Sequence, residues 1–282
     1  MNSIKEILLS KTKFDLEENK EKFIQSFVQL YQLEILRPSL NLIITKLKHN
    51  DAEFIIEVSK VWNRLAGHCT TTGFFEKIKD IFFHRKKYCV SIKTITPDVI
   101  IHEMAHAVDQ EMELDLNAEF RFVLGEDMKN KVSSHPHVAD AVRSVMRDEL
   151  KGYDFKNIME ELFARYFELL AMSYECGGYG RFHFRYGDIV RYFVKTTEWV
   201  EKILNPKILE KIDSDVTEYS EKLVEELEPY KKKWSEETAK SIYNKTMRKG
   251  AVGKWSGITK SDADWQKSYE EYVSKRSQKI EE

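Results

Sequence analysis

The 282-residue sequence lacks the features that mark membrane, secreted and nucleic-acid-binding proteins. It contains no run of about 18 or more apolar residues, and charged residues interrupt its first segment, from Met1 to Lys13. The sequence therefore predicts neither a membrane-spanning helix nor a secretory signal. Its 45 basic and 47 acidic side chains nearly cancel, which argues against a broad nucleic-acid-binding surface. We expect no membrane partner and no nucleic-acid partner.

Cysteine is also scarce. The three cysteines, Cys69, Cys89 and Cys176, form no C-x-x-C pair, and their odd number argues against a disulfide framework. A reducing compartment fits this pattern. We therefore expect the protein in the cytoplasm, or in a host cytosol after secretion without a signal peptide.

The sequence does contain an H-E-x-x-H motif, His102-Glu103-Met104-Ala105-His106. Two histidines four residues apart on a helix project from one face, at a spacing that suits a tetrahedral zinc ion. The glutamate between them would lie close enough to activate a water molecule as a general base. Thr96 and Pro97 favour a helix start before the motif, and the β-rich run 88–95 predicts a strand leading into it. The motif predicts the chemistry of a zinc peptidase.

A catalytic zinc ion usually has three protein ligands, so a second element must supply one more. The third histidine of the metzincin pattern is excluded, because Met112 stands at its position. A carboxylate on the helix predicted for residues 157–171 is the remaining common solution, and Glu160 and Glu161 compete for the role. Glu161 shares its face with small residues that would let the histidine helix approach, so packing favours Glu161.

The two motifs, H-E-M-A-H-A-V-D at 102–109 and E-L-F-A-R-Y-F at 161–167, resemble those of gluzincin-type zinc peptidases with an E-x-x-A-x-x-F second motif, including ImmA/IrrE-like peptidases. They are also similar to the peptidase-like domains of large polyvalent phage proteins. The resemblance covers about residues 85–175, and the segment between the motifs is longer than in compact members of these families. It implies three zinc ligands, His102, His106 and Glu161, and one general base, Glu103.

Other polar residues have candidate roles around such a site. Glu168, on the face of Glu161, and Asp109, beside the histidines, could each accept a hydrogen bond from a zinc-bound imidazole; a solvated carboxylate is the alternative for both. The segment 174–187 is rich in glycine and aromatic residues. Within it, Tyr179 and His183 are candidates to bind substrate and to donate to the oxyanion, against the alternative that they only pack.

Two other metal-binding patterns carry less weight. Cys89 would supply the cysteine ligand of a peptide deformylase, but the glycine-containing cysteine motif of that family is missing, and a buried thiol is commoner in an apolar strand. His135 and His137 flank Pro136, yet no partner motif supports a second metal ion.

The rest of the sequence is expected to be mostly helical. Apolar residues recur at helical spacing over residues 3–36 and 39–66, and again after the second motif. This predicts an α+β fold: a zincin-like core with a short sheet of about three strands, the HExxH helix and a second, glutamate-bearing helix. Residues 1–187 would form the metallopeptidase domain. Residues 188–282 would form a helical extension, broken near Pro206, for recognition of a substrate or partner.

The expected function is zinc-dependent hydrolysis of peptide bonds in one or a few selected intracellular proteins. A repressor-cleaving regulator and a bacterial effector acting inside a host cell are two forms of this function. Glu103 would take a proton from the attacking water and pass it to the leaving amine. The alternative is a zinc-containing protein-binding module without catalysis.

Overall fold

The computed structural model describes residues 3–56, 58, 67–71, 88–114, 118–129, 136–148, 155–176 and 184–229. The chain divides into two compact units, Met1–Lys231 and Lys232–Glu282, and the second unit lies outside the described residues. The described helices after residue 187 belong to the first unit. The functional division expected at that residue stays a prediction.

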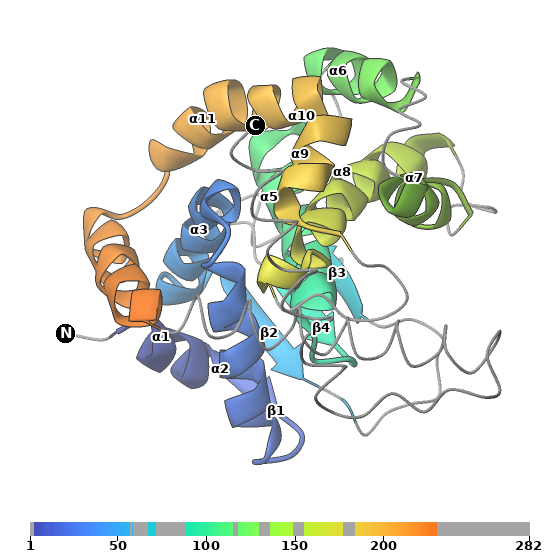
Figure 1. The fold of residues 1–282 in the computed structure, drawn as a ribbon. Coiled ribbons are helices and arrows are strands. Elements are labelled where there is room, and N and C mark those ends of the chain that lie inside the picture. Colours follow the sequence, from blue (N-terminus) through green and yellow to red (C-terminus); the bar gives the residue numbers. More distant parts are fainter. Residues whose placement is uncertain are drawn as a thin grey trace, which may run out of the picture. The chain divides into compact units, whose positions relative to one another are not determined.

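Helices dominate the first unit, and the described strands form one small sheet (Figure 1), which confirms the expected α+β class. In chain order the elements are α1 (Ile4–Lys11), β1 (Thr12–Phe14), α2 (Asn19–Leu30), η1 (Glu34–Leu36), α3 (Arg37–Lys48), β2 (Ala52–Ile56), β3 (Gly67–Thr71), β4 (Tyr88–Ile92), α5 (Pro97–Met112), α6 (Ala118–Lys129), α7 (Pro136–Arg143), η3 (Ser144–Asp148), α8 (Phe155–Ala171), η4 (Tyr174–Cys176), α9 (Tyr186–Tyr192), α10 (Val194–Trp199), η5 (Val200–Leu204) and α11 (Asn205–Leu209). A helix over residues 214–229 follows.

The sheet has four strands among the described residues, in the order β1-β2-β4-β3. β1, β2 and β4 run parallel, and β3 is antiparallel to β4. Phe54 of β2 pairs with Thr12 of β1 on one side and with Val90 of β4 on the other. The strand expected before the HExxH motif is therefore confirmed as β4, in the interior of the sheet.

Two helical segments expected from the sequence are wrong in part, because each contains a strand. β1 interrupts the segment 3–36, and β2 interrupts the segment 39–66. In β2 the buried Ala52, Phe54 and Ile56 alternate with half-buried residues, the period of two of a strand. A short apolar run allows either period, and here pairing with neighbouring strands decides for the strand.

Helix α5 carries the HExxH motif through the core of the unit. Thr96 is its N-cap residue and Pro97 its first helical residue, as expected, although the Thr96 side chain makes no capping hydrogen bond. Its apolar side chains Ile100, Met104 and Val108 are fully buried. The helix contacts β3, β4, α2 and α3, and its most extensive contact is with α8. This packing leaves the motif facing α8.

Glu111 fixes the C-terminal end of α5. Its carboxylate lies 3.0 Å from Nζ of Lys46 in α3 and 3.3 Å from Nζ of Lys211, and it accepts a hydrogen bond of 2.9 Å from the Tyr88 hydroxyl of β4. Three segments distant in sequence thus meet at one side chain, which holds the motif helix against the sheet and α3.

The helices that follow α8 pack onto the same core. The buried carboxylate of Asp127 in α6 accepts hydrogen bonds from the backbone N–H of Thr196 (2.7 Å) and of Lys195 (3.2 Å) at the start of α10. The hydroxyls of Tyr166 in α8 and Thr197 lie 2.9 Å apart. The break expected near Pro206 is wrong, because the proline lies in the first turn of α11, directly after the π-helical η5.

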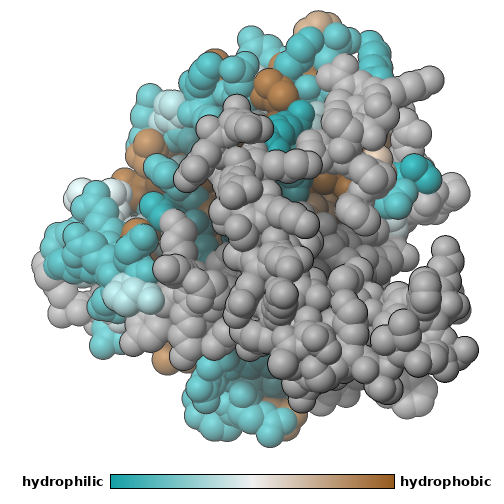
Figure 2. Space-filling view, viewed as in Figure 1, coloured by the Kyte–Doolittle hydropathy of each residue, from teal (hydrophilic) through white to brown (hydrophobic). Residues whose placement is uncertain are grey.

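The described surface is mainly hydrophilic in the view of Figure 2, where hydrophobic residues appear as separate spots. Among the described residues, the exposed large apolar side chains are Leu9, Leu16, Phe122, Val194, Ile203 and Leu209. Within the described part of the chain, every helix is too short or too polar to cross a membrane.

Candidate metal centre

Helices α5 and α8 bring three candidate ligands together. The Nε2 atoms of His102 and His106, one helical turn apart on α5, lie 3.3 Å from each other. The carboxylate of Glu161 on α8 faces both, with one oxygen 3.5 Å from Nε2 of His106 and the other 3.6 Å from Nε2 of His102. The sequence argument for Glu161 over Glu160 therefore agrees with the geometry, since Glu161 is the residue beside the histidines.

These separations match those between the ligands of one metal ion. Bonds of about 2.0–2.1 Å to a tetrahedral ion place neighbouring ligand atoms about 3.3–3.5 Å apart. The three side chains are 11–14% exposed, so they are shielded from solvent but still reachable. His102, His106 and Glu161 are thus close enough to hold a metal ion.

The hydrogen bond of His102 orients its ring for metal binding. Nδ1 of His102 lies 2.9 Å from Oε2 of Glu168, so the Nδ1–H donates to the carboxylate and Nε2 is left to face His106 and Glu161. Burial alone would lower the pKa of His102, but this hydrogen bond and the charge of Glu168 outweigh it and raise the pKa. The role proposed for Glu168 from the sequence is confirmed as a contact.

His106 is held in its neutral form. Burial, together with the nearby charges of His102 and Arg165, lowers the pKa of His106 to about 3. A neutral imidazole keeps the lone pair that a metal ion needs. The two histidines therefore differ in environment: among the described residues, a carboxylate contacts the far ring nitrogen of His102 and none contacts that of His106.

Glu103 is buried beside the three candidate ligands. Burial raises the pKa of Glu103 to about 7; the charge of His102 opposes this rise, and that of Glu161 adds to it. Its Oε2 atom, like Oε2 of Glu161, is buried without a hydrogen-bond partner in the described structure. Unpartnered buried oxygens are uncommon, and two of them at one site are expected where an ion and a water molecule bind.

Arg165 completes the charged surroundings and was missed by the sequence argument. Its guanidinium donates a hydrogen bond of 2.8 Å from Nη1 to Glu168, and its Nε lies 3.6 Å from Oε2 of Glu161. The signal was present, because Arg165 lies four residues after Glu161 and three before Glu168, on one helical face. An arginine is not a metal ligand, so a motif defined by its ligands does not single it out.

Several other predicted residues lie elsewhere or outside the described residues. Tyr179, His183 and His135 are outside them, as is the side chain of His137. Asp109 is buried on α5, but it is Glu168 that His102 contacts. Cys89 lies in β4 and is not part of the three-residue group, so the geometry does not support the deformylase pattern.

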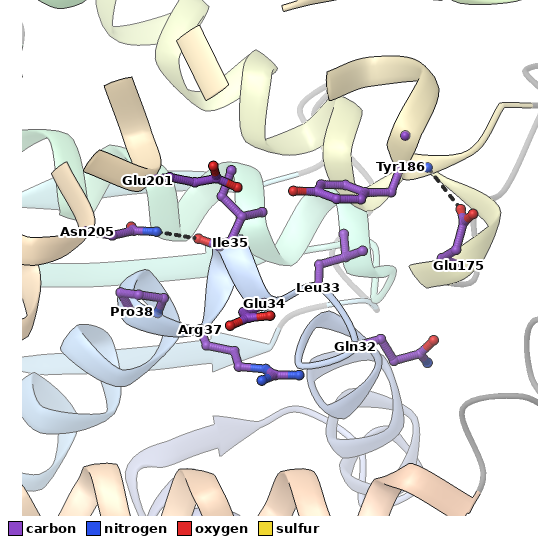
Figure 3. Close-up of a pocket in the computed structure, with 11 residues that line it drawn as sticks. Gln32, Leu33, Glu34, Ile35, Arg37, Pro38, Glu175, Tyr186, Glu201 and Asn205 are labelled. Atoms are coloured by element: carbon purple, nitrogen blue, oxygen red, sulfur yellow. Dashed lines mark hydrogen bonds between the residues drawn. The ribbon is translucent and has the colours of Figure 1, made fainter. Parts of the chain in front are cut away.

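A cavity of about 700 Å³ lies apart from these ligands (Figure 3). Residues from η1 and the start of α3 form one wall, and Glu175, Tyr186, Glu201 and Asn205 come from segments after α8. Backbone N–H of Tyr186 donates to Glu175 at 3.0 Å, and the amide of Asn205 donates to the carbonyl of Ile35 at 3.2 Å. None of the candidate metal ligands lines this cavity.

Comparison of the chain with protein-family models, with curated proteins and with solved structures found no match. The resemblance to gluzincin-type peptidases therefore stays a prediction. The function is therefore inferred from the geometry and chemistry of the site.

Proposed function

We propose that the chain is a zinc-dependent endopeptidase. The observation that carries the proposal is the convergence of His102, His106 and Glu161, with ligand atoms 3.3–3.6 Å apart, beside the buried carboxyl of Glu103. Two imidazoles and one carboxylate are a common ligand set of catalytic zinc in peptidases, and they leave a coordination position for water or substrate. A structural zinc site uses four protein ligands, whereas three converge here among the described residues.

Zinc held by these residues would lower the pKa of a water molecule and polarise the carbonyl of the scissile peptide bond. The remaining chemistry belongs to the chain. Glu103 takes the proton of the attacking water on its unpartnered oxygen and transfers it to the nitrogen of the leaving amine. Burial raises the pKa of this carboxyl above its ordinary value, which makes it a stronger base than an exposed glutamate.

We infer that the substrates are one or a few selected intracellular proteins. The helices α6, α7 and α9–α11 make up much of the described unit and contribute none of the residues of the metal centre. We assign these helices to recognition of the selected substrate. A repressor-cleaving regulator and a secreted effector acting in a host cell both fit this expectation.

The metal content of the purified protein tests the first part of the proposal. We expect about one zinc ion per chain in the wild type, and its loss in Glu161→Ala, because two histidines alone hold zinc weakly. Glu160→Ala is the matched control, since it removes the neighbouring carboxylate on the same helix and should retain zinc. Loss of zinc in the control and retention in Glu161→Ala would overturn the ligand assignment.

Cleavage tests the second part. A library of peptides from an intracellular proteome should be cut by the wild type at a small set of sites, and Glu103→Gln should retain zinc but lose cleavage, because Glu103 is not a ligand. Full cleavage by Glu103→Gln would refute the mechanism. Zinc binding without any cleavage by the wild type would favour the non-catalytic binding module.

A further inference from the structure

We propose that Arg165 is a positioning residue that separates the tasks of the two carboxylates on α8, so that Glu168 orients His102 and Glu161 remains available to the metal ion. The inference rests on the proposed metal site, and it concerns a residue outside the ligand set. It is carried by the contacts of Arg165 with both carboxylates.

The first contact saturates one oxygen of Glu168. Oε2 of Glu168 accepts from Nη1 of Arg165 at 2.8 Å and from Nδ1 of His102 at 2.9 Å. Two donors on a single oxygen, one from each helix, leave the carboxylate little freedom to turn. Because Glu168 is held in this way, it fixes the orientation of the His102 ring and is not directed at the space between the histidine Nε2 atoms.

The second contact attracts the Glu161 carboxylate but leaves its oxygen able to bind a metal ion. Nε of Arg165 lies 3.6 Å from Oε2 of Glu161, near enough for ionic attraction but longer than a hydrogen bond. This oxygen has no hydrogen-bond partner in the described structure, so its lone pairs remain for a metal ion. One guanidinium thus binds Glu168 firmly and Glu161 loosely, and the difference decides which carboxylate serves as the ligand.

The shape of the guanidinium makes this division possible. The side chains of Arg165, Glu161 and Glu168 are only 13–15% exposed. Solvent therefore screens the repulsion between the two carboxylates only weakly. Nε and Nη1 lie at fixed positions in one plane and reach a different carboxylate each. A lysine ammonium carries the same charge at one point and would have to choose between the two.

Metal affinity and ligand geometry test the inference. Zinc affinity is measured by competition with a chelating dye, and Co²⁺ replaces zinc as a spectroscopic probe whose visible absorption reports the coordination geometry. Arg165→Lys and Arg165→Gln should each bind zinc about 10–100-fold more weakly than wild type, the usual loss when an outer partner of a metal ligand is removed. Their Co²⁺ spectra should also differ from that of the wild type.

Two comparisons separate positioning from charge and from folding. Arg143→Gln is the control, because Arg143 forms an exposed pair with Asp140 on α7, and this variant should match wild type in affinity and spectrum. Circular dichroism establishes which variants fold. If Arg165→Gln does not fold, the test rests on Arg165→Lys, which keeps the positive charge. Wild-type affinity and spectrum in Arg165→Lys would overturn the inference, because charge alone would then suffice.

A double-variant cycle gives a second, independent reading. If Arg165 acts through Glu168, the combined Arg165→Gln/Glu168→Gln variant should lose less zinc affinity than the product of the two single losses. Losses that multiply would overturn the inference. Failure of the wild type to bind zinc or Co²⁺ would instead overturn the proposed function, and the inference with it, so the two failures are distinguishable.

Discussion

Replacement of Glu111 by glutamine should weaken the fold at neutral pH and have no effect in acid. Burial alone would raise the pKa of Glu111, but the hydrogen bond and charge of Lys46, with the Tyr88 hydroxyl and Lys211, outweigh it and lower the pKa below the ordinary 4.5. A group whose pKa is depressed by folding stabilises the folded state above its unfolded pKa. This contribution disappears as the pH falls through the folded pKa.

The size of the effect follows from what glutamine retains. Its amide oxygen can still accept one of the bonds from Tyr88 and Lys46, but the negative charge opposite Lys46 is lost. A hydrogen bond to a charged group contributes about 1.5–3 kcal/mol and a neutral one about 0.5–1.5 kcal/mol, so the loss should be about 1–2 kcal/mol at pH 7. Lys211 adds little, because its side chain is 42% exposed.

Urea unfolding followed by circular dichroism measures this difference. The free energies of unfolding of wild type and Glu111→Gln should differ at pH 7, and the difference should shrink as the pH falls below about 4.5, the ordinary pKa of the group. Glu218→Gln, which removes an exposed partner of Lys222, should match wild type throughout. A difference that stays constant with pH, or no difference at pH 7, would refute the role assigned to the Glu111 charge.

Two further substitutions test buried polar groups. Tyr166→Phe removes the hydroxyl that lies 2.9 Å from the Thr197 hydroxyl and leaves the latter unpaired, so urea unfolding should show a loss of about 1–2 kcal/mol; wild-type stability would contradict the contact. Gln32→Met should raise the free energy of unfolding by about 1 kcal/mol, because both polar atoms of the buried Gln32 amide lack a partner in the described structure. A less stable Gln32→Met variant would show that this amide, at the wall of the cavity in Figure 3, makes a stabilising interaction.

The candidate site was largely predictable because its parts lie on two helices with regular periods. The spacing of His102 and His106 places them on one face, and the same argument applied to α8 selected Glu161 and Glu168. Periodicity is local information, and a single sequence carries it in full. The pairing of the α5 and α8 faces depends on residues distant in sequence. It was inferred only from the small residues around Glu161.

The sheet was harder to predict because its strands are defined by their neighbours. β1 and β2 fall in segments whose apolar residues also fit a helical period, and parallel pairing with distant strands determines their conformation. The cavity shows the same limit more strongly. Gln32 and Asn205 line it together although they lie far apart in the chain, and no local pattern relates them.

An H-E-x-x-H sequence also needs residues outside the ligand set to become a metal site. Among the described elements, α5 and α8 make the most extensive contact, and Ala164 on α8, which shares its face with Glu161 and Glu168, is fully buried. Larger side chains at such positions would push the helices apart, and ligand atoms 3.3–3.6 Å from one another tolerate little movement. Glu111, at the end of α5, then holds the motif helix in register with the sheet and α3. The motif supplies two histidine ligands. Close packing of α5 against α8 and the Glu111 anchor determine whether Glu161 lies near enough to be the third.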